Sequence, residues 1–169
     1  SVVPPMDGIQ QPHVCTVTEI LNGTVRLRDK RVAVIGSGLT GLETAEILAG
    51  ESNRVMVVEM LNQIGQGVYV QHLEDIVPRL KSYNVDFLPG HKLVKINANS
   101  IILEKTADRQ QREEKIDYVV FSVGRISNDT LARELLPHVK RVYNIGDARK
   151  VGRVAQAVRD GFDTAWNLE

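Results

Sequence analysis

The chain has 169 residues, a formal net charge of zero at pH 7 and a single cysteine, Cys15. A balanced charge favours neither general nucleic-acid binding nor attachment to an anionic membrane. One cysteine excludes an internal disulfide, a CxxC redox pair and a cysteine-ligated cluster within this chain. No apolar stretch reaches the length needed to span a bilayer, and the start lacks the layout of a signal peptide, so we expect a cytoplasmic protein.

The first 30 residues have the composition of an extended arm. They open with Ser-Val-Val-Pro-Pro-Met-Asp-Gly and without an initiator methionine, which we interpret as a piece taken from within a longer polypeptide. Residues 13–17 are a candidate short strand and residues 18–21 a candidate helical turn. A disordered arm is the alternative.

Residues 31–59 carry the most informative pattern in the chain. The β-branched run 31–35 predicts a buried parallel strand, and it continues directly into a glycine-rich turn. A helix is predicted over 42–49, with Gly50 as its stop, and a second strand over 54–58 that ends at Glu59. This order is typical of the β-α-β unit that binds dinucleotides. The turn supplies six candidate cofactor-binding residues: Gly36, Ser37, Gly38, Leu39, Thr40 and Gly41.

Each part of this motif has a physical role. Gly36 allows a tight turn out of the strand, Gly38 lets the backbone approach a pyrophosphate, and Gly41 lets the helix pack closely. The free N–H groups and the positive dipole end of the helix attract the diphosphate. Glu59 is placed to accept hydrogen bonds from a ribose diol. The alternative is a glycine-rich turn that only packs a helix onto a sheet.

The same acid favours NAD(H) over NADP(H). A 2′-phosphate would be repelled by the Glu59 carboxylate and would need a nearby arginine. Residues 60–63 contain no basic side chain, and Arg54 lies at the far end of the strand.

The rest of the chain predicts a layered α/β fold. We expect a Rossmann-like, three-layer arrangement of FAD/NAD(P)-binding-domain type, with a parallel sheet and an antiparallel β-meander. Helices are predicted over 69–83, where Pro78 indicates a kink or a late start, and over 151–166. Further strands are predicted over 85–88, 92–96, 100–105, 113–116, 117–123 and 141–145.

The motifs, taken in order, resemble those of a known family. The chain is similar to the C-terminal pyridine-nucleotide-binding region of two-dinucleotide-binding-domain flavoproteins. More narrowly, it resembles NADH:flavin oxidoreductases related to 2,4-dienoyl-CoA reductase and trimethylamine dehydrogenase. The stretches that carry the resemblance are Val34-Ile-Gly-Ser-Gly-Leu-Thr-Gly-Leu-Glu-Thr-Ala45, Val57-Val-Glu-Met-Leu-Asn-Gln-Ile-Gly65, Phe121-Ser-Val-Gly-Arg125, Tyr143-Asn-Ile-Gly-Asp-Ala148 and Gly152-Arg-Val-Ala-Gln-Ala-Val-Arg-Asp-Gly161.

The resemblance implies a division into three parts. Residues 1–30 would be a linker arm from a preceding FAD half-domain, residues 31–121 an NAD(H)-binding domain, and residues 122–169 the returning part of the FAD-type domain. In the Gly146-Asp147-Ala148 motif, the Asp147 carboxylate would bind the ribityl or pyrophosphate region of the flavin. The alternative for Asp147 is a cap on the helix that follows.

The resemblance also adds three candidates near the nicotinamide nucleotide. Glu43 would lie near the nicotinamide end, although a solvent-facing glutamate favoured by the helix dipole is the alternative. Gly124 would allow a close backbone approach, and Met60 would lie beside the bound nucleotide. Ser127-Asn128 departs from the Pro-Asn of the related motif, so this loop is expected to be less rigid.

The function implied is the delivery of hydride from NADH to a flavin within a longer enzyme. FMN on a barrel domain and a [4Fe–4S] cluster are expected only in that full-length protein, and only part of an FAD site is expected here. We find no catalytic residues and no metal-ligand pattern in the sequence, so we expect the chain alone to bind NAD(H) without turnover. The alternatives are a non-catalytic NAD-sensing module and an S-adenosylmethionine-dependent methyltransferase.

Overall fold

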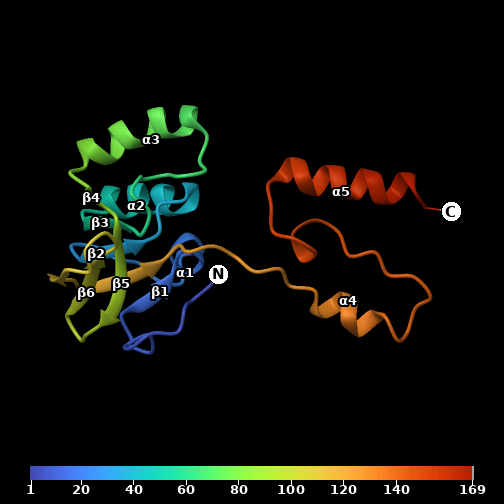
Figure 1. The fold of residues 1–169 in the computed structure, drawn as a ribbon, viewed down its shortest axis with the longest axis horizontal. Coiled ribbons are helices and arrows are strands. Elements are labelled where there is room, and N and C mark those ends of the chain that lie inside the picture. The colour runs from blue at the N-terminus through green and yellow to red at the C-terminus, as the bar shows by residue number, and fades with distance from the viewer. Residues whose placement is uncertain (169) are drawn as a thin grey trace. The chain divides into compact units, whose positions relative to one another are not determined.

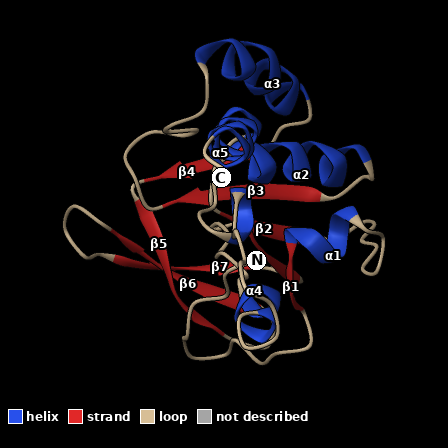
Figure 2. Cartoon of the chain, turned by 90° about the vertical axis from the view of Figure 1, so that its right-hand side faces the viewer, coloured by secondary structure: helices blue, strands red, loops and turns tan. Residues whose placement is uncertain are grey.

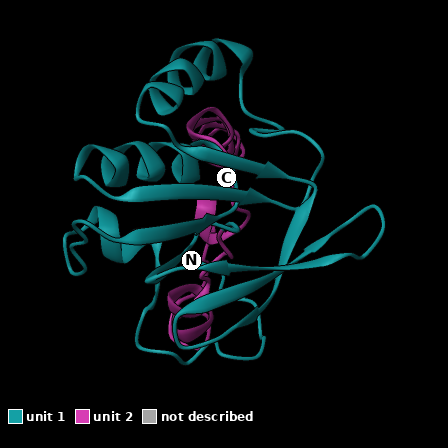
Figure 3. Ribbon diagram, turned by 90° about the vertical axis from the view of Figure 1, so that its left-hand side faces the viewer, with its two compact units in different colours: residues 1–124 teal, residues 125–169 magenta. Residues whose placement is uncertain are grey.

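The structure is a computed structural model that describes residues 1–168. The chain divides into two compact units, Ser1–Gly124 and Arg125–Glu169, which Figure 3 shows in different colours. In the described residues, no helix combines the length and the apolar character needed to cross a membrane.

A parallel sheet of five strands forms the centre of the first unit (Figures 1 and 2). Its order is β1-β8-β2-β3-β4, and all four neighbouring pairs are parallel. The central strands are runs of β-branched residues because both of their faces are covered. The strands are β1 (Val14–Thr16), β2 (Arg31–Ile35), β3 (Arg54–Glu59), β4 (Asp86–Pro89) and β8 (Tyr118–Phe121).

Three helices pack on one face of this sheet. They are α1 (Val17–Leu21), α2 (Leu39–Gly50) and α3 (Val70–Ser82). Val32 and Val34 of β2 belong to the same apolar cluster as Leu42 of α2 and Leu80 of α3. Pro78 lies inside α3 without ending it.

An antiparallel sheet covers the opposite face. Its strands are β5 (His91–Ile96), β6 (Ser100–Lys105) and β7 (Gln111–Lys115), in that order. Ala33 and Ile35, which alternate with the helix-facing residues of β2, join Ile101 and Leu103 of β6 in a second apolar cluster. The α/β fold with a parallel sheet and an antiparallel meander is therefore confirmed.

The N-terminal arm is ordered and lies within the first unit. β1 pairs with β8 at the edge of the parallel sheet, and Glu19 accepts hydrogen bonds from both the N–H and the hydroxyl of Thr16. Earlier in the arm, the N–H of Val2 donates to the carbonyl of Gly124 over 2.9 Å, and the N–H of Ile96 donates to the carbonyl of Asp7 over 3.0 Å. Residues 1–30 thus contribute strand, helix and loop to this unit.

The second unit contains α4 (Thr130–Leu135), the 3-10 turn η1 (Gly146–Ala148) and α5 (Val154–Trp166). The prediction of a strand over 141–145 is wrong, because these residues pair with no strand in the described chain and an extended segment needs such a neighbour to satisfy its backbone groups. The sequence did not predict α4, and α5 begins at Val154 rather than at residue 151. Between residues 125 and 168, no described side chain is buried.

Candidate functional site

The turn between β2 and α2 requires glycine at two positions. Gly36 has a φ of +104°, and a Cβ there would lie 2.5 Å from the carbonyl oxygen of Ser122. A Cβ on Gly41 would lie 2.2 Å from the carbonyl oxygen of Gly36. Since both clashes are with backbone, the two glycines let α2 start directly against the ends of β2 and β8.

Gly38 has a different environment. Apart from Gly38 itself and its two chain neighbours, no residue has an atom within 4 Å of the position of its Cβ, so the space in front of this backbone is open. Gly38 is the N-cap of α2, in extended conformation, and Leu39 and Thr40 begin the first turn. The first N–H groups of a helix have no partner within it and carry the positive end of its dipole. The start of α2 can therefore hold an anion in this open space.

A cavity of about 550 Å³ lies at the carboxyl ends of β2, β3 and β8. The chain runs from β2 through β3 to β4 on one side, whereas β8 pairs with the other side of β2. Such a switch point is where open parallel sheets bind ligands. Among the residues that line the cavity are the predicted Gly36, Ser37, Gly38, Glu59, Met60 and Gly124.

The Glu59 carboxylate at the end of β3 is held in place from three directions. Its Oε2 accepts hydrogen bonds from the N–H of Ser37 over 2.9 Å and from the Ser37 hydroxyl over 2.7 Å. Its Oε1 accepts the N–H of Leu61 over 3.0 Å. Partial burial alone would raise the pKa of Glu59, but these hydrogen bonds outweigh it and hold the pKa below its usual value. The group is therefore an anion at neutral pH, and a carboxylate has about four acceptor positions, so it can accept further donors.

The remaining predicted residues of the first unit have mixed positions. Met60 lies on the cavity wall with 59% of its surface exposed. Gly124 has a φ of +108°, with no atom near the position of its Cβ. Glu43 is an exposed residue of α2 and does not line the cavity, which agrees with the solvent-facing alternative.

The structure adds cavity residues that the motif did not indicate. His91, Lys92 and Leu93 of β5 line it, as do Pro4 and Met6 of the arm. Lys92 is occupied by an ion pair, with its Nζ 3.0 Å from Glu104 Oε1. The sequence signal was the Pro89-Gly90 pair, which turns the chain directly from β4 into β5. Because β5 and the arm are far from the glycine-rich turn in the sequence, the sequence alone did not indicate that they line the same cavity.

Gly146, Asp147 and Ala148 form η1 in the second unit. The N–H of Gly146 donates to Asp160 Oδ2 over 2.7 Å, and Asp147 Oδ1 accepts the N–H of Gly152 over 3.1 Å. Asp147 therefore stabilises the turn that leads into α5, as a capping residue would. Gly146 also lines a cavity of about 290 Å³ between η1 and α5.

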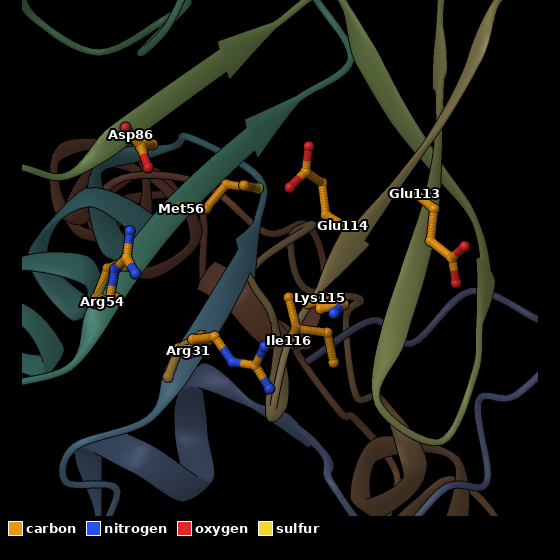
Figure 4. A pocket seen from close by; sticks show the side chains of 10 residues that line it. Arg31, Arg54, Met56, Asp86, Glu113, Glu114, Lys115 and Ile116 are labelled. Atoms are coloured by element: carbon orange, nitrogen blue, oxygen red, sulfur yellow. The ribbon is translucent and has the colours of Figure 1, made fainter.

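A further cavity of about 380 Å³ lies at the opposite, amino ends of β2, β3 and β4 (Figure 4). Arg31 and Arg54 line it from the parallel sheet, and Glu113, Glu114 and Lys115 line it from β7. In Figure 4 the side chain of Glu114 points toward Met56, whereas that of Glu113 points away. Both signs of charge line this cavity, and several of the charges are already paired: Arg31 with Asp117, Glu114 with Arg112, and Glu113 with the Ser100 hydroxyl. Among the described residues that line it, the charges of both signs are interspersed, which favours no single class of ligand.

Comparison with known proteins agrees with this arrangement. The model of the pyridine nucleotide-disulphide oxidoreductase family matches residues 1–161, and the chain belongs to this family. It is 33% identical over 163 residues to a bilirubin reductase of Mediterraneibacter gnavus, which covers 96% of this chain and 25% of the relative. It is 29% identical over 174 residues to an NADH oxidase of Thermoanaerobacter brockii, which covers 99% of this chain and 26% of the relative.

A similar chain is found among solved structures. A 2-naphthoyl-CoA reductase in complex with 2-naphthoyl-CoA superposes with a TM-score of 0.88 at 26% identity, over 99% of this chain and 25% of that one. The present chain thus spans about a quarter of the length of these relatives. Members of the family bind nicotinamide and flavin dinucleotides. The methyltransferase alternative is accordingly set aside.

Proposed function

We propose that residues 1–124 bind NAD(H) in the 550 Å³ cavity. The observation that carries this proposal is the meeting of three features at one switch point: the open backbone of Gly38, the N-terminus of α2 and the anionic Glu59. These residues fit the cofactor. The N–H groups at the start of α2 face an open space suited to a diphosphate, and the Glu59 carboxylate can accept hydrogen bonds from a ribose diol.

In this proposal the chain binds and orients the cofactor. The N–H groups at the start of α2, from Gly38 to Gly41, hold the pyrophosphate. Glu59 accepts hydrogen bonds from the adenosine ribose, and the lack of a Cβ at Gly124 leaves room beside the nicotinamide. The apolar cavity wall, which includes Leu93 and Phe121, excludes water. The bound nucleotide supplies the hydride, and the protein contributes positioning and electrostatics.

We further propose that the chain is the NAD(H)-binding part of a longer flavin-dependent oxidoreductase. The family and the length of the relatives support this. In that enzyme the bound nicotinamide would supply hydride to a flavin, as the resemblance to enzymes related to 2,4-dienoyl-CoA reductase implies, and FMN and a [4Fe–4S] cluster would be held by regions outside this chain. A cytoplasmic location stays a prediction.

Residues 122–169 are proposed to be the returning part of an FAD-type domain, with Asp147 near the flavin. The exposure of α5 supports this assignment. Val154, Phe162 and Trp166 lie on one side of α5 and are 81%, 63% and 78% exposed. Such a row of large apolar side chains fits a surface that another part of a larger domain covers. FAD affinity of the isolated chain is expected to be weak.

The experiment is a titration of the 169-residue chain with NADH, followed by calorimetry and by nucleotide fluorescence. We expect saturable binding with one site, and weaker binding of NADPH because Glu59 repels a 2′-phosphate. Glu59→Gln should weaken the binding of NADH. Glu113→Gln is the matched control, since Glu113 also accepts a hydrogen bond from a buried serine but does not line the cavity.

The proposal fails if the folded wild-type chain shows no saturation at millimolar NADH, or if Glu59→Gln and Glu113→Gln affect binding equally. Sedimentation with and without NADH separates the remaining alternative: an NAD-sensing module would change its association state when the nucleotide binds.

A further inference from the structure

The Ser37 side chain connects three parts of the candidate site. Its hydroxyl donates to Glu59 Oε2 over 2.7 Å and accepts the N–H of Gly65 over 2.9 Å. Ser37 lies in the glycine-rich turn, Glu59 at the end of β3, and Gly65 in the loop that leads to α3. One hydroxyl thus joins the pyrophosphate-binding turn, the ribose-binding acid and the rim of the cavity.

This hydroxyl is shielded from water, and its one proton is already donated. Ser37 is 1% exposed although it lines the cavity. A serine hydroxyl has one proton to donate, and Glu59 takes it. Loss of the hydroxyl would leave the Gly65 N–H without its acceptor in a buried place, and such a group is costly. The hydrogen bond from the Ser37 N–H to Glu59 would remain, so the carboxylate would lose one of its two bonds to the turn.

The loop after β3 depends on the same contact. Gly65 has a φ of +70°, and a Cβ there would lie 2.3 Å from a methyl group of Leu73 in α3. Met60 and Leu61, which precede Gly65 in this loop, line the cavity. The position of the loop therefore affects both the Glu59 carboxylate, through the Leu61 N–H, and the cavity wall.

We propose that Ser37 is a positioning residue for the nicotinamide nucleotide: its hydroxyl orients the Glu59 carboxylate toward the ribose, both directly and by holding the 60–65 loop, whose Leu61 N–H binds the same carboxylate. This inference rests on the proposed function, and it assigns to the second residue of the glycine-rich turn a role that spacing does not indicate. Ser37 acts through Glu59 and needs no contact of its side chain with the nucleotide.

The chain contains a matched pair that serves as a control. Ser100 is 4% exposed, and its hydroxyl donates to Glu113 Oε1 over 2.5 Å. It also accepts a hydrogen bond from the side chain of Asn97 over 3.1 Å. Ser100→Ala and Ser37→Ala therefore remove the same kind of buried bond, from serine to glutamate, in the same compact unit. Only Ser37 lines the proposed site.

The test is a double-mutant cycle on NADH affinity. Dissociation constants are measured for the wild-type chain, Ser37→Ala, Glu59→Ala, the double variant and Ser100→Ala, with thermal unfolding of each. We expect Ser37→Ala to weaken NADH binding by about fivefold to tenfold, which corresponds to one ordered hydrogen bond, and Ser100→Ala to leave it unchanged. Because Ser37 acts through Glu59, the double variant should bind no more weakly than Glu59→Ala. Where the alanine variant does not fold, Glu59→Leu replaces it, because leucine also lacks an acceptor for the Ser37 hydroxyl.

Several results would overturn the inference. Binding by Ser37→Ala within twofold of the wild type excludes a positioning role, and additive effects of Ser37→Ala and Glu59→Ala exclude action through the carboxylate. A Ser37→Ala chain that does not fold would assign the hydroxyl to the fold alone. A wild-type chain that does not bind NADH overturns the proposed function itself and this inference with it, which distinguishes that failure from the others.

Discussion

Replacing Gly38 by alanine separates nucleotide binding from folding. The position adopts a φ of −60°, which alanine tolerates, and no atom lies within 4 Å of the added methyl group. The change also lowers the entropy of the unfolded chain while removing a favourable N-cap residue, and these effects oppose each other. We therefore expect the free energy of unfolding to change by less than about 1 kcal/mol.

The expected effect on binding is much larger. In the proposed complex, the added methyl group would occupy the open space in which the pyrophosphate meets the start of α2. A hydrogen bond to a charged group contributes about 1.5–3 kcal/mol, so displacement from one or two of the N–H groups costs about 2–3 kcal/mol, or about 30-fold to 150-fold in the dissociation constant of NADH.

The assay is NADH titration of Gly38→Ala together with its thermal unfolding. Gly50→Ala is the matched control, because Gly50 lies at the other end of the same helix and also has no atom within 4 Å of the position of its Cβ. Gly50→Ala should bind NADH like the wild type. If Gly38→Ala binds NADH within threefold of the wild type, the assignment of the pyrophosphate to this turn is refuted.

Three further predictions concern the fold. Gly41→Ala places a methyl group 2.2 Å from the Gly36 carbonyl oxygen and should lower the free energy of unfolding by about 3 kcal/mol or more; denaturation equal to that of Gly50→Ala would contradict this. Arg31 holds the pKa of Asp117 at about 2, so the ion pair stabilises the fold above about pH 5 and this contribution is lost as the pH falls through 4 toward 2. Asp117→Asn should lower the free energy of unfolding by about 1 kcal/mol at pH 7, since the pair is partly exposed, and by less at pH 2. A loss of stability that does not depend on pH would argue against the ion pair. Burial, with a smaller contribution from Glu19, raises the pKa of Cys15 to about 12. Iodoacetamide at pH 8 should therefore label Cys15 only after denaturation. Rapid labelling of the native chain would show instead that the thiol is accessible.

The parallel sheet was predictable because its signal is local. After Arg31, residues 32 to 35 are all apolar, and successive residues such as Val34 and Ile35 belong to different apolar clusters on the two faces of the sheet. The predicted start of helix α2, at residue 42, was too late. The glycine-rich stretch was interpreted as a turn up to Gly41, whereas Gly38 is the N-cap and the helix begins at Leu39.

The strand predicted over 141–145 shows the limit of such reasoning. Its valine, tyrosine and isoleucine favour a strand, but strand formation depends on a neighbour that shares its backbone hydrogen bonds, and the described residues provide none. The apolar row on α5 was likewise visible in the sequence, whereas its exposure was not.

The sequence by itself determined the order of strand, glycine-rich turn, helix and acid, because each depends on residues close together in the chain and on the backbone freedom of glycine. Only the tertiary structure brought Glu59 and Gly65 within hydrogen-bond distance of the Ser37 hydroxyl. It also placed β5 and the N-terminal arm around the cavity. These contacts join residues far apart in the chain, and their geometry follows from the packing of two sheets against each other, for which local propensity carries no signal.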